Sequence, residues 1–210
     1  AGNLLCAEQS GFILEMGFEL YEKIVNEAVA ELRASEFENI FDEQKLQRQI
    51  KTSCIIEADF DAYIPSYYVE DDAERLDLYR RLARFENESE VEEIRNELRD
   101  RFGEFTNEVE NLLLLVGLRC AVSQYGFTKI EIKKYIISIE FPDESQKAFY
   151  DGRIFQAVMH YVSNSSKNTM RFETTGKKIR LEIRYTKALS PLEKVHYVKN
   201  IFNDMVLTSV

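Results

Sequence analysis

The chain has 210 residues, enough for one sizeable hydrophobic core with a short additional segment but not for two large domains. Hydrophobic residues make up 45% of it, and only 8 glycines and 3 prolines are present, which excludes a disordered chain and favours a helix-rich globular protein. The net charge of −10 argues against unspecific DNA wrapping. The charge is uneven, with an acidic middle and a basic C-terminal part, so the two could bind each other or two different partners.

The cysteines lie far apart without the spacing of a metal site, at Cys6, Cys54 and Cys120. This pattern fits a reducing cytoplasm. The longest apolar run, from Leu112 to Leu118, is too short to cross a membrane, and no signal peptide begins the chain. We therefore expect a soluble, cytoplasmic protein without a membrane partner. Because the chain starts at Ala1 without an initiator methionine, we also expect it to be a piece of a longer polypeptide.

The N-terminal part separates into three segments. Residues 1–11 read as a glycine-bounded loop, and residues 13–34 repeat apolar side chains at 3 and 4 positions, which predicts an amphipathic helix. Residues 35–49 are polar and weakly patterned, so we interpret them as a linker. The main domain is then expected over residues 50–210.

The main domain is predicted to begin with a strand and to continue with helices. From Lys51 to Ile64 apolar and polar residues alternate, and Pro65 follows, which predicts a strand with one buried face. Three helices are expected next, over residues 70–86, 89–102 and 107–124. The first has acidic residues at its start and arginines at its end, as the helix dipole favours. Thr106 can cap the third, which is apolar nearly all round.

Alternating hydrophobicity returns after Gly126. Residues 128–141 read as strands, residues 145–162 as a helix, and a hairpin of two further strands is expected over residues 170–174 and 178–185. Ser190-Pro191 opens the last helix, which runs through Met205. These elements predict an α+β fold, with a mainly antiparallel sheet packed with several helices and preceded by an N-terminal helical arm.

The predicted helix over residues 89–102 has signals at both ends. Ser89 can take the N-cap, Glu92 the third helical position, and Gly103 the left-handed stop. In that frame the buried stripe consists of Val91, Ile94, Leu98 and Phe102. The outer positions are mostly carboxylates, namely Glu90, Glu93, Glu97 and Asp100, together with Arg101. Such a ridge suits a cationic partner, although a solvated helix face has the same pattern.

The sequence contains none of the usual enzyme motifs. It has no nucleophile elbow, no phosphate-binding glycine loop, and no cluster of histidine or cysteine with metal-type spacing. His160 and His196 fall on two different predicted helices, so we assign them structural or surface positions. Glu57, Asp59 and Asp61 share one face of the predicted strand. They could bind a divalent cation, or they could form an ordinary solvated face, which we prefer.

Basic side chains collect on the predicted hairpin, at Arg171, Lys177, Lys178, Arg180 and Arg184. Nucleic acid could bind this hairpin, residues 171–184, through its phosphates, with Tyr185 as a nearby aromatic side chain. The alternative is the charged outer face of a hairpin. We prefer the alternative because the chain is acidic and lacks an aromatic ladder.

Three stretches resemble one family, the bacterial transcription-repair coupling factors. The first covers residues 2–11 and Gly17-Phe18-Glu19-Leu20-Tyr21, and is similar to the tail of the translocation motif shared with the branch-migrating helicase RecG. The second is Tyr63-Ile64-Pro65 leading into residues 75–83. The third and most specific is EEIRNELRDRFG, residues 92–103.

The resemblance implies a division of the chain. Residues 1–34 would end the second translocase domain, and residues 50–210 would form the C-terminal regulatory domain. The coupling of ATP hydrolysis to movement on DNA would involve the residues that match the motif, Gly2, Gln9 and Gly11. The motif departs from the family pattern, because Cys6 replaces a usual glycine and Phe12 a usual histidine.

In this family the complete protein binds RNA polymerase stalled at a DNA lesion, displaces it by ATP-driven translocation on double-stranded DNA, and recruits the excision-repair protein UvrA. The resemblance therefore implies ATP and Mg for the complete protein, and neither a catalytic residue nor a cofactor in this part. The C-terminal domain is expected to be an autoinhibitory clamp over the arginine-bearing, UvrA-binding face of an N-terminal UvrB-like module. Glu97 and Asp100 are carried over as clamp contacts, and helix geometry adds Glu93 and Arg101.

Overall fold

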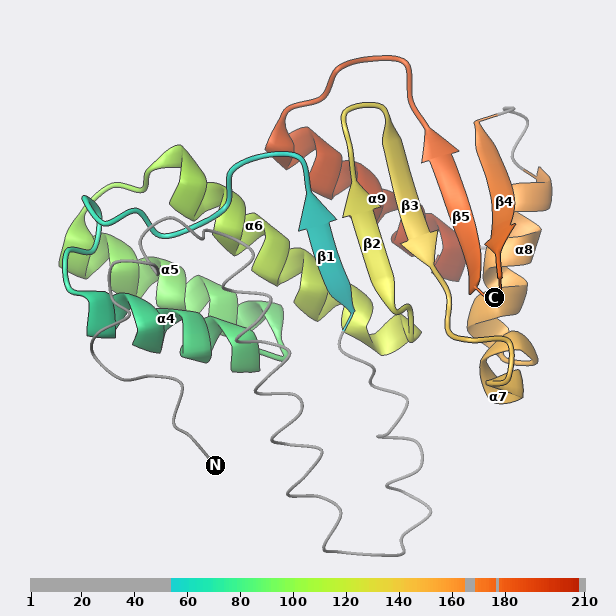
Figure 1. Cartoon of the computed structure of the whole chain (residues 1–210), viewed down its shortest axis with the longest axis horizontal. Coiled ribbons are helices and arrows are strands. Elements are labelled where there is room, and N and C mark those ends of the chain that lie inside the picture. Colours follow the sequence, from blue (N-terminus) through green and yellow to red (C-terminus); the bar gives the residue numbers. More distant parts are fainter. Residues whose placement is uncertain (1–53, 165–168, 177, 208–210) are drawn as a thin grey trace, which may run out of the picture. The chain divides into compact units, whose positions relative to one another are not determined.

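The structure, a computed structural model, describes residues 54–164, 169–176 and 178–207 (Figure 1). The described residues fall into two compact units. Unit 1 contains residues 61–116, and unit 2 contains residues 54–60 together with those after 116. The predicted loop, helix and linker of the N-terminal part lie outside the described residues. No helix in the described part combines the length and the apolar character needed to cross a membrane.

Unit 1 is built from helices. They are α4 (Asp72–Arg84), α5 (Glu88–Phe102) and the first part of α6 (Asn107–Val122). The Asp71 carboxylate caps α4 by accepting the backbone N–H of Glu74 at 2.7 Å. The Thr106 hydroxyl accepts the N–H of Val109 at 3.3 Å, which confirms the predicted cap of α6. The three predicted helices are therefore confirmed, with ends that differ by at most two residues.

The core of unit 1 is formed by leucine and isoleucine side chains from all three helices, namely Leu78, Leu82, Ile94, Leu98, Leu112 and Leu113. Two buried tyrosines join the loop before α4 to this core. The Tyr79 hydroxyl accepts the N–H of Ile64 at 2.8 Å, and burial raises the pKa of Tyr79 to about 12. The Tyr68 hydroxyl donates toward the carbonyl of Leu98 at 3.3 Å. The first bond gives the Ile64 N–H of the loop a partner, and the second ties the loop to the last turns of α5.

The start of α5 corrects the prediction. The N-cap is Asn87 rather than Ser89. Glu90, not Glu92, reaches back, and its carboxylate accepts the N–H groups of Glu86 and Asn87 at 2.8 and 2.9 Å. Because Asn87 also precedes a glutamate by three residues, two overlapping capping boxes were possible, and the earlier one forms. The helix ends before Gly103, as predicted, and the φ of Gly103 is positive at 84°, but its ψ of −156° lies outside the left-handed helical region that was expected.

Unit 2 contains a mixed five-stranded sheet with the order β1-β2-β3-β5-β4. The strands are β1 (Ile55–Ala58), β2 (Lys129–Ile132), β3 (Ile136–Glu140), β4 (Met170–Thr175) and β5 (Lys178–Arg184). Only the β1–β2 pair is parallel, and the other three pairs are antiparallel. The predicted α+β class with a mainly antiparallel sheet is therefore confirmed.

The first strand is much shorter than predicted. Its last ladder bond runs from the Asp59 N–H to the Ile132 carbonyl at 3.0 Å. Ala62 and Ile64 are still buried, but they belong to unit 1, so the alternation of the sequence continues beyond the end of the sheet. The alternation of apolar and polar residues therefore predicted correctly which side chains are buried, but it predicted too long a strand.

Helices cover one face of the sheet in unit 2. They are α7 (Lys147–Tyr150), α8 (Arg153–Asn164) and α9 (Pro191–Leu207), with a short 3-10 turn at Ser123–Tyr125. Figure 1 shows α8 and α9 lying along the same side of the strands. The sheet turns alternate side chains toward this side, namely Ile130, Ile132, Ile137, Ile139, Leu181 and Ile183. Phe127 then packs against Phe202 of α9, with ring centroids 5.1 Å apart.

The helix predicted over residues 145–162 is interrupted, which corrects the prediction. α7 ends at Tyr150 and α8 begins at Arg153, with Gly152 between them. A Cβ atom at Gly152 would lie 2.9 Å from the carbonyl oxygen of Ala148, closer than real Cβ atoms come. Glycine therefore permits the tight junction, and apolar spacing alone gave no sign of it.

Candidate functional site

The outer face of α5 carries a line of exposed polar side chains. We call Ser89, Glu93, Asn96 and Asp100 the outer line, because their spacing of 4, 3 and 4 residues places them on one stripe of the helix. The buried side chains Val91, Ile94 and Leu98 lie on the opposite face. Seven residues separate Glu93 from Asp100, which corresponds to about 10 Å along the axis. Neither carboxylate has a hydrogen bond or ion pair with the described residues of the chain.

Glu97 lies on the flank of α5 that faces α4. Its carboxylate accepts two hydrogen bonds from the Arg81 guanidinium, at 2.8 Å on Oε1 and 2.5 Å on Oε2. Arg101 donates a third, at 3.0 Å to Oε1, and also pairs with Glu74 of α4. The hydrogen bond from Arg81 lowers the pKa of Glu97. We call Glu74, Arg81, Glu97 and Arg101 the α4–α5 network.

The other flank of α5 is held against the start of α6. Arg95 pairs with Glu110 at 2.6 Å. The guanidinium groups of Arg95 and Arg99 lie 5.4 and 4.9 Å from the centroid of the Phe105 ring, within cation–π range. Both flanks of α5 are therefore engaged within unit 1, and the outer line between them is exposed.

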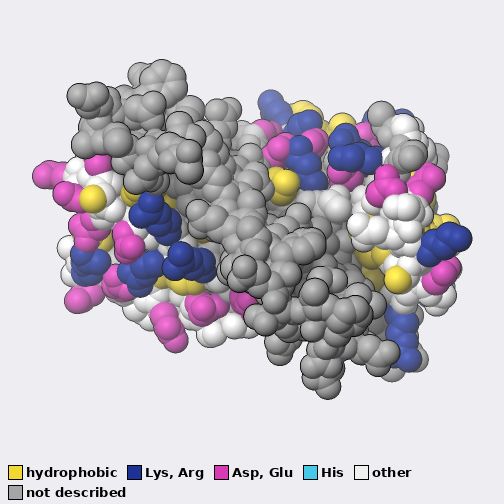
Figure 2. Space-filling view, turned by 60° about the horizontal axis from the view of Figure 1, so that its bottom comes forward, with side chains coloured by type: hydrophobic (Ala, Val, Ile, Leu, Met, Phe, Trp, Pro, Cys, Tyr) yellow, Lys and Arg dark blue, Asp and Glu magenta, His cyan; other side chains and the backbone are white. Residues whose placement is uncertain are grey.

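Unit 1 as a whole is strongly acidic. Residues 61–116 contain 16 aspartates and glutamates against 7 arginines, and no lysine. In Figure 2 dark blue and magenta side chains adjoin one another on the left-hand part of the surface. The arginines Arg81, Arg95 and Arg101 are paired with carboxylates, so the unpaired excess is negative. This charge distribution favours a cationic partner.

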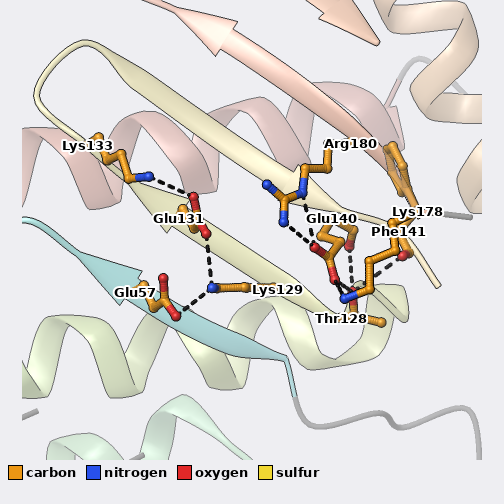
Figure 3. A network of polar contacts seen from close by, with 9 residues as sticks. All are labelled: Glu57, Thr128, Lys129, Glu131, Lys133, Glu140, Phe141, Lys178 and Arg180. Atoms are coloured by element: carbon orange, nitrogen blue, oxygen red, sulfur yellow. Dashed lines mark hydrogen bonds and ion pairs between the residues drawn. The ribbon is translucent and has the colours of Figure 1, made fainter. Parts of the chain in front are cut away.

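The face of the sheet opposite the helices carries a charged ladder (Figure 3). Lys129 lies between Glu57 and Glu131, at 2.5 and 3.0 Å, and Lys133 pairs with Glu131 at 3.0 Å. Glu140 is the most buried of these carboxylates, with 8% of its side chain exposed. It accepts hydrogen bonds from Lys178 and Arg180, both at 2.8 Å.

The basic hairpin is neutralised by this ladder. Lys178 and Arg180 bind Glu140 of β3, and Arg171 binds Glu182 at 2.8 Å. Arg184 lies 3.6 Å from the same Glu182, while Lys177 falls outside the described residues. A cation whose field is cancelled by an adjacent carboxylate attracts phosphate weakly, so this geometry does not favour the nucleic-acid alternative.

Acid is expected to destabilise the sheet of unit 2. Burial by itself would raise the pKa of Glu131, but hydrogen bonds from Lys129 and Lys133 outweigh it and lower that pKa to about 2. A carboxylate with a lowered pKa in the folded state stabilises the fold above the pKa of the unfolded chain, about 4.3, and this stabilisation is lost as the pH falls toward 2. We expect the urea midpoint to fall over this range, and Glu131→Gln to flatten its pH dependence. The exposed Glu144→Gln is the control, and an equal flattening by both variants would contradict the prediction.

The predicted divalent-cation ligands are not brought together. Glu57 pairs with Lys129, and Asp59 pairs with Lys194 of α9. Asp61 lies beyond β1, where its carbonyl accepts a hydrogen bond from Asn111 at 2.8 Å. Among the described residues no group of three possible metal ligands forms. The expectation that they share one strand face was wrong, because β1 ends at Ala58.

The remaining candidates take ordinary positions or lie outside the structure. The His160 ring is exposed and contacts the Asn164 side chain at 2.8 Å, and His196 is exposed on α9. Cys54 and Cys120 are buried and form no disulfide among the described residues, and burial raises the pKa of Cys54 to about 12, so its thiol is unreactive. The motif residues Gly2, Gln9 and Gly11 lie outside the described range, as does Cys6.

Comparisons with known proteins identify the family. Residues 58–151 match the TRCF domain. The transcription-repair-coupling factor of Staphylococcus haemolyticus is 31% identical over 156 residues, which cover 74% of this chain and 13% of that protein. The chain belongs to the transcription-repair coupling factor family. The Rickettsia typhi member of the family is 29% identical over 209 residues, covering 99% of this chain and 15% of that protein. The chain thus spans only a small part of its curated relatives.

A solved structure supports the same placement at the level of the fold. The crystal structure of a C-terminal domain of transcription-repair coupling factor aligns with a TM-score of 0.55. The alignment covers 75% of this chain and 95% of that domain, at 23% sequence identity. The TRCF match includes α5 and its flanks, so the outer line and the α4–α5 network both lie within the family's domain.

Proposed function

We propose that this TRCF domain is a non-catalytic, autoinhibitory part of an ATP-dependent DNA translocase. It docks on a UvrB-like module of the same protein through the outer face of α5. Glu93, Glu97, Asp100 and Arg101 are the proposed contacts. The observation that carries the proposal is the outer line, where Glu93 and Asp100 are exposed without a partner in the described chain on a helix fixed from both flanks.

In the closed state the docked domain would cover the UvrA-binding face of that module. The complete protein would use ATP and Mg to move on double-stranded DNA, displace stalled RNA polymerase and recruit UvrA once the clamp opens. The chemistry of α5 supports a cationic docking surface, because unit 1 has an excess of carboxylates over arginines. A basic surface with two guanidinium groups about 10 Å apart would match the spacing of Glu93 and Asp100.

The energy required for such a clamp is modest. A two-state closure that is 99% complete needs about 2.7 kcal/mol. Charge-assisted hydrogen bonds contribute about 1.5–3 kcal/mol each, so two of them suffice. A much stronger interface would prevent release, and this fits a docking surface with few charged contacts rather than a large apolar one.

Docking is expected to depend on the outer line. Changing Glu93→Ala together with Asp100→Ala should weaken binding of this chain to the separately expressed UvrB-like module by about 100-fold or more at low salt, because two charge-assisted bonds are lost. The unchanged chain should bind less tightly as salt rises, since exposed charges are screened. Calorimetric titration at two salt concentrations measures both effects.

The matched control is Glu144→Ala with Asp151→Ala, which removes two exposed acidic charges from unit 2. It should leave binding nearly unchanged. In the complete protein, the Glu93 and Asp100 variant should also raise UvrA binding and basal ATPase activity. Wild-type behaviour of that variant in all these assays would show that the outer line is only a solvated helix face.

A further inference from the structure

Arg81 is a residue of α4, but its guanidinium group binds a residue of α5. The two parallel bonds to Glu97 form the planar, fork-to-carboxylate arrangement that only arginine can make. About 40% of the Arg81 side chain and 31% of the Glu97 side chain are exposed, so the pair lies at the surface beside the outer line.

Counting acceptor positions shows what Glu97 can still do. A carboxylate offers about four positions for hydrogen bonds. Arg81 occupies one on each oxygen, and Arg101 occupies a second on Oε1. One position remains on Oε2. Glu97 can therefore accept a single bond from outside the domain, whereas Glu93 and Asp100 can each accept a bidentate pair.

We infer that Arg81 is a positioning residue of the docking surface. It holds Glu97 in one orientation, so that the remaining Oε2 position is ready to receive one donor of a cationic partner. This inference rests on the proposed function, since it names a further residue of the same docking surface. Arg101 takes part in the same arrangement from within α5, where Glu74 fixes it in turn.

The inference predicts a change in docking affinity opposite to the change that net charge alone would cause. Removing a positive charge from an acidic surface should strengthen binding to a cationic partner by simple attraction. Removing Arg81 also removes two of the three hydrogen bonds that hold the Glu97 side chain, so this side chain must lose more rotamer freedom on binding. If positioning dominates, the loss of Arg81 weakens docking even though the domain becomes more acidic.

The test compares Arg81→Gln with Arg80→Gln. Arg80 is a neighbouring exposed arginine of α4 that has no hydrogen bond or ion pair with the described residues. Both variants lose one positive charge. Titration with the UvrB-like module should show binding about 3- to 10-fold weaker for Arg81→Gln, and unchanged or tighter for Arg80→Gln. Arg81→Lys, which keeps the charge without the fork, should also weaken binding.

Combination with Glu97→Gln separates positioning from a general loss of folding. On that background Arg81→Gln should no longer weaken binding and should behave like Arg80→Gln, because the group that it positions has lost its charge. Tighter binding by Arg81→Gln, matching Arg80→Gln, would overturn the inference while leaving the docking function intact. Absence of binding by the unchanged chain would overturn both.

Discussion

Replacing both Lys178 and Arg180 by methionine is expected to destabilise unit 2 by about 3 kcal/mol at neutral pH. Both cations bind Glu140, of whose side chain only 8% is exposed. Their loss would leave a nearly buried carboxylate without a counter-charge, held only by the Thr128 hydroxyl at 3.4 Å. Hydrogen exchange at the amides of β3 and β5 measures the effect in unit 2 itself.

Two further variants show whether the unpaired charge is the cause. Adding Glu140→Leu to the double variant should restore much of the stability, because an apolar side chain tolerates this position better than an unpaired carboxylate. Changing Lys147 and Lys187 to methionine removes two exposed cations of unit 2 and should have little effect. If the amides of β3 and β5 were equally protected from hydrogen exchange in the Lys178 and Arg180 variant and in this control, the prediction would be contradicted.

Leu98→Ala is expected to destabilise unit 1 by about 2–5 kcal/mol. Leu98 is 1% exposed on the buried face of α5, so its truncation leaves a cavity in the core. Faster hydrogen exchange should appear in α4 and α5, and docking should weaken because the outer line loses its rigid support.

Comparing Leu98→Ala with the Glu93→Ala and Asp100→Ala variant distinguishes the role of the buried face of α5 from that of its exposed face. Those exposed changes should alter stability by no more than about 0.5 kcal/mol while weakening docking. Leu98→Ala should instead lower the stability of unit 1 strongly, and any weakening of docking should follow from that loss of stability. If Leu98→Ala left exchange in α5 unchanged, the assignment of this face to the core would be wrong.

The helices of unit 1 could be predicted because their signals are local. Apolar spacing gave the buried face of α5, and Gly103 gave its end. The end of β1 at Ala58 could not be predicted, since the strand stops where pairing with β2 stops, and the residues after it are buried in another unit. The junction at Gly152 was equally hidden, because it depends on backbone atoms that come close only in the folded chain.

The candidate surfaces divide in the same way. Helix geometry placed Glu93, Glu97 and Asp100 on the outside of α5, but it could not show that Glu97 is bound by Arg81, 16 residues earlier on another helix. The basic hairpin was visible in the sequence, whereas its neutralisation comes from Glu140, 38 residues before Lys178. Pairs of this kind are set by tertiary packing, and the sequence carries no local signal for them.

The absence of lysine from residues 61–116 has a practical consequence for experiments. Amine-reactive dyes and cross-linkers cannot attach within residues 61–116, so labelling leaves the side chains of the outer line and of the α4–α5 network chemically intact. The same property makes acetylation unable to alter these charges, because it acts on amines and not on guanidinium groups. Any covalent regulation of the docking charges would have to use a different chemistry, such as arginine methylation, which keeps the charge but blocks the bidentate fork.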